Sequence, residues 1–390
     1  MSQSDYGGGN IQERSPGRWR VTVELGRDPQ TGRRLRRRFT VVGSRTDALK
    51  KRREALSQRD AGTLIPADKV TLAEWLTSWL ERHYSEGHVS AKSHDRYRVV
   101  VQRHLVPALG RLKLQDLRPD HISDAKARWL SGKRSTADQP LSGASVHKHL
   151  VVLRRALSDA VRSRLISRNP ADLVSAPSVR SRTERRALTE DEIRSLVSAA
   201  RGTRYDLPIR FTMATGIRQG ELLGLKWEDV DLDAGTVAIR RTLSYIAGAT
   251  IFAPPKTERS RRIIELSDVT VSALRQYRSE QSTRRLMLGP AWQEHGLVFP
   301  STIGTPWLSR SLYRGYRGVL ERSGISDPRS VNWHTLRHTA ATQWLSHGVD
   351  IFSVSRRLGH ASASFTMDVY AHLLKGQQRQ AAEALDYLLA

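Results

Sequence analysis

Hydrophobic and polar residues alternate in two segments near the start of this chain. Apolar side chains occupy every second position in residues 19–25, and residues 35–42 resume the extended pattern after a turn that contains glycine, proline and aspartate. Alternation of this kind is typical of half-buried strands, so the two segments predict a hairpin. Ser44 and Asp47 then have the spacing of a capping box at the start of a basic helix, residues 48–59.

A helical period replaces the alternation from residue 71 to about residue 174. Trp75 and Trp79 belong to a stripe of apolar residues at intervals of three and four, and residues 146–161 repeat that spacing. Ser90 is placed to cap a helix that runs to Arg103. These patterns predict an all-helical domain of about four or five helices, with the Trp and Leu stripes in its core. Expected breaks lie at residues 107–110, 118–119 and 131–143.

A second globular unit follows a polar segment that contains Pro177. Thr189 and Glu192 form another capping pair, residues 237–242 and 261–266 have the composition of strands, and helical patterns dominate the rest. The predicted fold class is therefore α+β and multidomain. The predicted domains are residues 11–62 (a small sheet plus a helix), residues 68–175 (all-helical), residues 176–186 (a linker) and residues 187–390 (a mainly helical α+β unit with a C-terminal tail).

The chain carries a large positive charge. Its 390 residues include 64 Lys and Arg against 39 Asp and Glu, which gives a formal net charge of +25. Such a charge attracts polyanions and raises their association rate, so DNA, RNA and anionic membrane are all open as partners on charge alone. There is no cysteine, which excludes disulfides, thiolate metal sites and a cysteine nucleophile.

The start of the chain has no pattern typical of export. Residues 1–10 contain no apolar core of a signal peptide, and no stretch of the sequence approaches the roughly 18 apolar residues of a membrane span. We therefore expect no membrane partner and a cytoplasmic protein that is associated with the nucleoid.

The predicted N-terminal hairpin and helix concentrate basic residues. Taken alone, such a run is most often a solvated face. On an exposed sheet face beside Trp19 and Phe39 it is also suited to DNA, because a β-ribbon can enter a major groove and arginine can reach bases or phosphates. The predicted DNA-binding residues are Arg33, Arg34, Arg36, Arg37, Arg38, Lys50 and Lys51.

Basic side chains scattered through the second half of the chain can together perform chemistry on a phosphodiester. Its transition state spreads negative charge over non-bridging oxygens, which guanidinium groups stabilise. Histidine can accept a proton, lysine can protonate a leaving oxygen, and a tyrosine whose phenolate is favoured by nearby cations can attack phosphorus. Taken singly, each such residue is more often an ion-pair, helix-end or packing residue. The candidate catalytic residues, a set that needs no metal, are Arg218, Lys256, His334, Arg337, His360 and Tyr370.

Two further residues stand beside these candidates. Glu221 comes three residues after Arg218 on the same helix face, and is either an ordinary ion-pair partner or a carboxylate that orients the guanidinium. His334 and His338 bracket Arg337 at a spacing that also suits a metal pair, but no Glu, Asp or Cys stands nearby to complete a site. We expect no metal, and we expect His338 to be a buried residue that supports the site.

In combination these segments resemble the tyrosine recombinase (phage integrase) family. The segments occur in the family's order, and the ordered set, with Tyr370 ten residues after His360, is far more specific than any one of them. Residues 71–174 resemble the family's helical core-binding domain, and residues 19–59 resemble its arm-type DNA-binding domain. The segments are Thr-Gly-Ile-Arg-Gln-Gly-Glu, Pro-Lys-Thr, Val-Phe-Pro, His-Thr-Leu-Arg-His, Arg-Leu-Gly-His and Thr-Met-Asp-Val-Tyr-Ala-His.

The resemblance implies what the residues do. The five basic candidates would assist, Glu221 would buttress them, and Tyr370 would attack, which joins the tyrosine to a DNA 3′ phosphate and frees a 5′ hydroxyl. Four protomers would exchange strands through a Holliday junction, and the protein would integrate or excise a phage or other mobile element. The implied partners are double-stranded DNA with core and arm-type sites and a homotetramer on that DNA. An excisionase and a DNA-bending protein are further candidates, and no cofactor is implied.

Two other functions stay open at this point. A type IB topoisomerase-like enzyme would use the same chemistry to relax DNA without a sequence requirement, although the arm-like domain argues against it. A DNA-binding regulator would keep the fold and use only the charge. The presence of Tyr370, Lys256 and both candidate arginines argues against a regulator.

Overall fold

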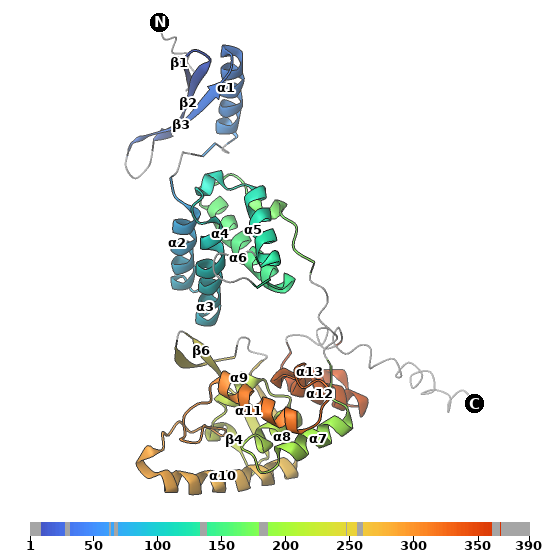
Figure 1. Cartoon of the computed structure of the whole chain (residues 1–390). Coiled ribbons are helices and arrows are strands. Elements are labelled where there is room, and N and C mark those ends of the chain that lie inside the picture. Colours follow the sequence, from blue (N-terminus) through green and yellow to red (C-terminus); the bar gives the residue numbers. More distant parts are fainter. Residues whose placement is uncertain are drawn as a thin grey trace, which may run out of the picture. The chain divides into compact units, whose positions relative to one another are not determined.

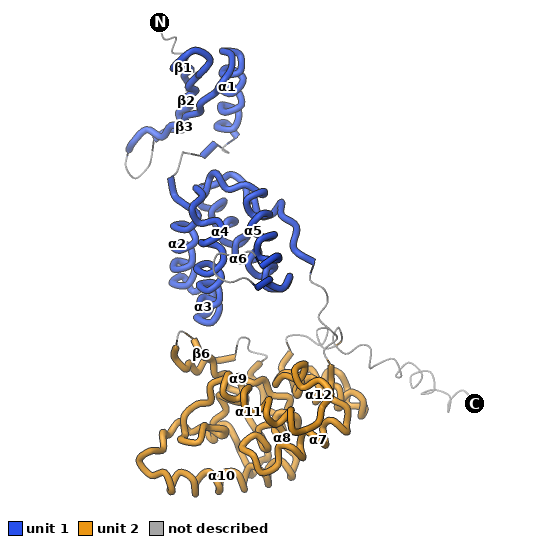
Figure 2. Tube along the Cα trace, in the orientation of Figure 1, with its two compact units in different colours: residues 1–180 blue, residues 181–390 orange. Residues whose placement is uncertain are grey.

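The structure of the chain is a computed structural model that describes residues 9–27, 32–61, 64–65, 69–132, 139–178, 186–246, 248–255, 260–360 and residue 367. The chain divides into two compact units, residues 1–180 and residues 181–390 (Figure 2). The finer division into residues 11–62, 68–175 and 187–390, with a linker at 176–186, stays a prediction. Within the described ranges, no helix combines the length and apolar character that a membrane crossing needs.

The N-terminal elements form a small sheet with a helix on one face (Figure 1). Strands β1 (Gly9–Ser15), β2 (Arg18–Arg27) and β3 (Arg34–Val42) pair antiparallel in the order β1-β2-β3, and helix α1 (Arg45–Asp60) follows. The predicted hairpin and the Ser44–Asp47 capping box are confirmed, whereas β1 has no counterpart among the predicted elements. The residues buried between sheet and helix are Val21, Val23, Ala48 and Ala55.

Residues 72–162 form the helical part of the first unit. Its helices are α2 (Leu72–Ser85), α3 (Ala91–Val100), α4 (Val106–Leu109), α5 (Pro119–Ser131) and α6 (Gly143–Arg162). Ser90 caps α3 as predicted, and the break predicted at residues 107–110 falls at the end of that range, because the helix continues through Pro107 to Leu109 and ends at Gly110. A π turn, Val101–Leu105, joins α3 to α4, and its wider ring accommodates the proline, which lacks an N–H.

The predicted stripes of Trp and Leu meet in the core of this helical part. Trp75 and Trp79 of α2 are both buried against α6. The indole N–H of Trp75 donates to the Ala156 carbonyl at 3.0 Å, and that of Trp79 donates to Asp159 Oδ2 at 2.6 Å. These bonds satisfy the polar end of each ring while its apolar body leaves water.

The second unit is mainly helical with two small sheets (Figure 1). Its helices are α7 (Glu190–Ala200), α8 (Asp206–Thr215), α9 (Gln219–Gly224), α10 (Asp268–Leu288), α11 (Ser309–Arg322), α12 (Trp333–Ser346) and α13 (Ile351–Leu358). The strands β4 (Val230–Asp231), β5 (Thr236–Ile239) and β8 (Arg262–Glu265) form one sheet, and β6 (Thr242–Ile246) and β7 (Ala249–Ala253) form a hairpin. The Thr189–Glu192 capping box at the start of α7 is confirmed.

One of the predicted strands differs from the structure. Residues 237–242 were predicted as a single strand, but they span the end of β5 and the first residue of β6. Arg241 lies at the turn between them, where its guanidinium donates to Asp229 at 2.6 Å and to Glu228 at 2.7 Å. This contact lies where the chain passes from one sheet into the other. The second predicted strand, residues 261–266, contains β8 and is confirmed.

The elements that carry the candidate residues share one core. Phe211 of α8, Leu222 of α9, Ile264 of β8 and Leu336 of α12 all belong to it. Leu358 of α13 packs with residues of α12 in an adjoining cluster. Because these elements are fixed by apolar packing, the polar groups at their ends have fixed positions as well.

Candidate active site

The turn between α8 and α9 places Arg218. Gly216 ends α8 with a φ of 65°, and a Cβ at this position would lie 2.6 Å from Leu358 Cδ2 and 3.0 Å from the ring of Trp344. Glycine is therefore required both for the backbone angle and for the close approach of α12 and α13. Arg218 follows as the N-cap residue of α9, which confirms that it stands at a helix start.

Glu221 connects Arg218 to a second arginine. Glu221 Oε1 accepts from Arg218 Nη1 at 2.8 Å, while Oε2 accepts from the Arg218 backbone N–H at 3.0 Å and from Arg262 Nη2 at 2.9 Å. Burial acts to raise the pKa of the Glu221 carboxyl, but Arg262 and then Arg218 outweigh it and hold that pKa below its ordinary value. Glu221 is thus a charged carboxylate that fixes the Arg218 guanidinium.

Helix α12 presents Arg337. The helix begins at a capped turn, in which Asn332 Oδ1 accepts the backbone N–H of His334 at 2.9 Å. His334 is exposed, and Arg337 lies one turn further along with only 2% of its surface exposed. Its Nη1 donates to the Gly216 carbonyl at 2.6 Å and its Nη2 to the Leu358 carbonyl at 2.6 Å. Arg337 therefore joins the α8–α9 turn to the end of α13.

A Schellman motif at the end of α13 fixes His360. Gly359 has a φ of 63°, its N–H donates to the Arg356 carbonyl at 3.0 Å, and the N–H of His360 donates to the Ser355 carbonyl at 3.1 Å. The predicted helix end at Leu358-Gly359-His360 is confirmed. The motif accounts for two of the carbonyl groups that a helix leaves without partners at its C-terminus.

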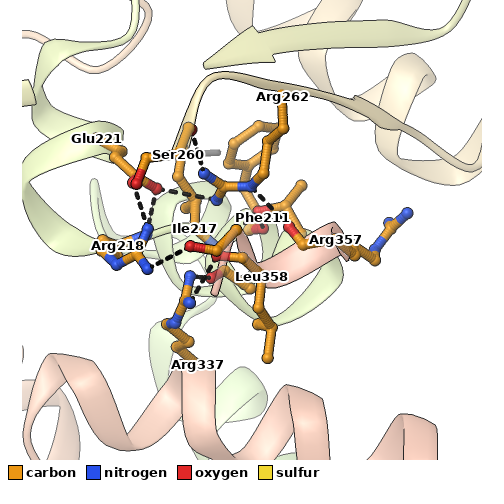
Figure 3. Close-up of polar contacts among 12 residues, drawn as sticks. Phe211, Ile217, Arg218, Glu221, Ser260, Arg262, Arg337, Arg357 and Leu358 are labelled. Carbon is orange, nitrogen blue, oxygen red and sulfur yellow. Dashed lines mark hydrogen bonds and ion pairs between the residues drawn. The ribbon is translucent and has the colours of Figure 1, made fainter. Parts of the chain in front are cut away.

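Three arginines bind the next three carbonyl groups. Figure 3 shows the guanidinium groups of Arg218, Arg262 and Arg337 gathered at this end of α13. The carbonyl of Arg357 accepts from Arg262 Nε at 2.7 Å, that of Leu358 from Arg337 Nη2 at 2.6 Å, and that of Gly359 from Arg218 Nη2 at 2.9 Å. Partial negative charge at the helix C-terminus favours these cations. The helix end thus collects guanidinium groups from α9, β8 and α12 beside His360.

His360 has a strongly lowered pKa in this setting. Burial, and after it the positive charges of Arg337 and Arg218, lowers the pKa of the His360 imidazole to about 3. The ring is therefore neutral at neutral pH, and it adds no further charge to the arginine cluster.

Replacing His360 by glutamine is expected to weaken the acid sensitivity of the fold. Because the folded pKa is about 3 and the ordinary value is 6.5, the unfolded chain binds the proton more readily, and stability falls as pH drops below 6.5. The loss is at most about 1.4 kcal/mol per pH unit. Thermal unfolding at pH 7 and pH 5 would measure it, with His295→Gln at an exposed position as the matched control. An equal drop in melting temperature for wild type and His360→Gln would contradict the expectation.

Several predicted site residues are brought together. Arg218, Arg337 and His360 meet at the end of α13, and the charge of His334 also contributes to the lowered pKa of His360. His338 is 7% exposed and so is buried next to Arg337 in the helix. The predicted residues Lys256 and Tyr370 lie outside the described residues.

Arg262 and Arg357 are parts of this arrangement that the sequence did not reveal. Arg262 Nη1 also donates to the Ser260 carbonyl at 3.0 Å, and Arg357 Nη2 donates to the carbonyls of Ala214 and Glu265, each at 3.0 Å. Both residues stand next to another arginine in a chain with many arginines, and all their partners except Ser260 are distant in sequence. The one signal in the sequence for Arg262 was its position near the start of the predicted strand at residues 261–266.

The predicted DNA-binding residues of the N-terminal sheet do not share one face. Arg34, Arg36 and Arg38 are exposed and alternate with residues that face α1. Arg37 lies on the α1 side, with its guanidinium 5.9 Å from the centroid of the Phe39 ring and a 2.5 Å bond to Gln115 Oε1. Arg33 and Lys50 are exposed, and Lys51 lies 5.4 Å from the Phe39 centroid.

The described residues contain no group of three His, Asp or Glu side chains that could hold a metal ion. In that part of the chain His334 and His338 therefore have no third ligand. The positions of His334 and His338 therefore give no support to the metal site that their spacing suggested.

Family models match most of the chain. Residues 186–377 match the phage integrase family, and residues 71–130 match the N-terminal SAM-like domain of phage integrases. The curated integrase of Streptomyces ambofaciens is 29% identical over 378 residues, which cover 95% of this chain and 93% of the relative. The tyrosine recombinase XerC of Bacillus licheniformis is 30% identical over 248 residues, which cover 62% of this chain and 75% of the relative.

Solved structures of similar fold include proteins bound to DNA. The Tn1549 transposon integrase in complex with a circular intermediate DNA has a TM-score of 0.66 and 17% identity, and the match covers 81% of this chain and 99% of that chain. A lambda integrase dimer bound to a core site has a TM-score of 0.56 and 20% identity, and covers 94% of this chain and 96% of that chain. These likenesses confirm the predicted fold.

Proposed function

This chain belongs to the phage integrase family and is a tyrosine recombinase, and we propose that it cuts and rejoins DNA at attachment sites through a covalent bond between Tyr370 and a 3′ phosphate. The observation that carries the proposal is the gathering of Arg218, Arg337 and His360 at the end of α13. Two guanidinium groups held at short distances by main-chain carbonyls can stabilise the charge of a phosphorane-like transition state.

Each proposed role follows from the chemistry of its side chain. Arg218 and Arg337 bind the non-bridging oxygens, and the Tyr370 oxygen attacks phosphorus in line with the departing 5′ oxygen. His334 accepts the proton of the phenol, and Lys256 donates a proton to the 5′ oxygen. The phosphotyrosine retains the energy of the broken bond, so a partner strand's 5′ hydroxyl can attack it and release Tyr370 without ATP.

The larger assembly is part of the proposal. In this proposal four protomers bind the DNA and exchange its strands in two rounds through a Holliday junction. The result is that a mobile element is integrated into its host DNA or excised from it. The exposed Arg34, Arg36 and Arg38 of the N-terminal sheet are the proposed contacts to arm-type sites. An excisionase and a DNA-bending protein are the proposed accessory partners, and the protein would be located on the nucleoid.

A recombination assay tests the proposal. Purified protein is mixed with two supercoiled plasmids that carry the element's attachment site and its host target, in the presence and absence of EDTA. We expect recombinant plasmids and a protein–DNA adduct that survives detergent, in equal yield with EDTA, because side chains supply the acid, the base and the charge stabilisation. Relaxation of any plasmid without recombination would indicate the topoisomerase-like alternative. Site binding without cleavage would indicate a regulator.

A further inference from the structure

We propose that Arg262 is a positioning residue for strand cleavage, which acts by holding Glu221 and the end of α13 so that Arg218 meets the phosphate correctly. The inference rests on the proposed function of the site. It concerns a residue that lies outside the predicted catalytic set and that is 44 positions away from Arg218 in the sequence.

The side chain of Arg262 is buried, and each of its three guanidinium nitrogens donates to the protein. The side chain is 5% exposed. Its Nε donates to the Arg357 carbonyl at 2.7 Å, its Nη1 to the Ser260 carbonyl at 3.0 Å and its Nη2 to Glu221 Oε2 at 2.9 Å. A guanidinium that donates from all three nitrogens to protein acceptors is suited to hold neighbouring groups in place.

The contact with Glu221 transmits this support to Arg218. The Glu221 side chain is 4% exposed, and a buried carboxylate needs compensating charge and hydrogen bonds. Arg218 supplies part of that charge, but its own side chain is 35% exposed and must also face the substrate. With Arg262 absent, Arg218 would be the carboxylate's one remaining ion-pair partner among the described residues. We infer that it would then be drawn toward Glu221 and away from the phosphate.

The other two contacts of Arg262 are with main-chain carbonyls, one at the end of α13 and one just before β8. The Arg357 carbonyl is the first of the three consecutive carbonyls at the end of α13 that arginines bind, so Arg262 holds the same helix end as Arg218 and Arg337. The Ser260 carbonyl lies just before β8. Arg262 is the first residue of β8, and through these bonds it connects that strand to Glu221 of α9 and to the end of α13. A shift of α9, β8 or α13 would therefore displace Arg218.

The test separates this role from a general loss of folding by changing the charge of the substrate. A nicked duplex carries either the normal phosphodiester or a methylphosphonate at the cleavage position. In the methylphosphonate a methyl group replaces one non-bridging oxygen, so the group is neutral and needs less stabilisation by guanidinium. The measurement is the single-turnover rate of strand cleavage for wild type, Arg262→Gln and Arg262→Lys, with Arg218→Gln as the reference for lost phosphate stabilisation.

We expect Arg262→Gln to cleave the normal phosphodiester about 10 to 100 times more slowly than wild type, the range typical of residues that orient a functional ligand. On the methylphosphonate we expect little change, as for Arg218→Gln. Arg262→Lys should lie between wild type and Arg262→Gln, because lysine keeps the charge but loses the fork-shaped set of donors.

The ratio of the two rates within each variant does not depend on how much of the protein is folded. An equal drop on both substrates, or no drop on the normal one, would overturn the inference. If Arg262→Gln does not fold, the same ratio for Arg262→Lys decides it. Absence of cleavage by the wild type would instead count against the proposed function, which keeps the two failures distinct.

Discussion

Replacing Tyr370 by phenylalanine is expected to abolish the covalent protein–DNA adduct and leave DNA binding nearly unchanged. The phenol oxygen is the proposed nucleophile, so its removal deletes the bond-forming atom. Binding depends on contacts between basic side chains and phosphates, which this change leaves intact. The measurement pairs an electrophoretic assay for the detergent-resistant adduct with a gel-shift assay at fixed salt concentration.

A second tyrosine provides the control for this variant. Tyr313 of α11 is 38% exposed and lies outside the proposed catalytic set, so Tyr313→Phe should form the adduct at the rate of wild type. Adduct formation by Tyr370→Phe would show that another residue attacks the phosphorus, and would exclude the proposed assignment. Loss of the adduct in both variants would point instead to a general effect of the substitutions.

Replacing Arg337 by lysine is expected to slow strand cleavage by about 100- to 1,000-fold, the range found when one donor to a developing oxyanion is removed. The charge is retained, but the geometry is lost. Arg337 spans the Gly216 and Leu358 carbonyls with two bonds of 2.6 Å, and a single ammonium cannot span both carbonyls and still reach a phosphate oxygen. The measurement is the single-turnover cleavage rate on a nicked attachment site.

Arg194→Lys provides the matched control for Arg337→Lys. Arg194 of α7 pairs with Glu190 and Asp191 on the surface, and its side chain is 69% exposed. Exposed ion pairs of this kind contribute little to stability, so the control should cleave at the rate of wild type. A cleavage rate within threefold of wild type for Arg337→Lys would mean that a positive charge suffices at this position and that the fork of donors does not matter.

Local signals in the sequence predicted the ends of several elements correctly. Ser44, Thr189 and Ser90 each cap the helix expected of them, because a cap depends on residues within one turn of each other. Gly359 ends α13 for the same local reason. These signals involve no distant partner, so the sequence alone is sufficient to read them.

Distant contacts caused the errors. The strand breaks at residues 240–241, where Asp229 and Glu228 bind the Arg241 guanidinium, and the strand pattern carries no trace of that contact. Strand β1 depends in the same way on pairing with β2, and its own residues have little strand character.

In the candidate site, too, the local motifs could be recognised from the sequence and the distant contacts could not. Arg218 and Arg337 belong to short motifs, so the sequence could name them, whereas the carbonyls that they bind, those of Gly359 and Leu358, lie at the end of α13 and carry no such signal. Main-chain carbonyls are present at every residue, and no residue type marks the ones that will be left without partners inside a helix. Arg262 was missed because its acceptors are two such carbonyls and a carboxylate 41 positions away.

The three adjacent carbonyls of residues 357–359 couple the arginines mechanically. Each guanidinium comes from a different element, yet all three are hydrogen-bonded to one short stretch of backbone. If α13 slides or rotates, Arg218, Arg262 and Arg337 lose these three acceptors together, while their bonds to Glu221, Ser260 and Gly216 remain, so the cluster should loosen at this end as a unit. An inhibitor that displaces α13 would then disable the whole cluster without touching the phosphate-binding groups.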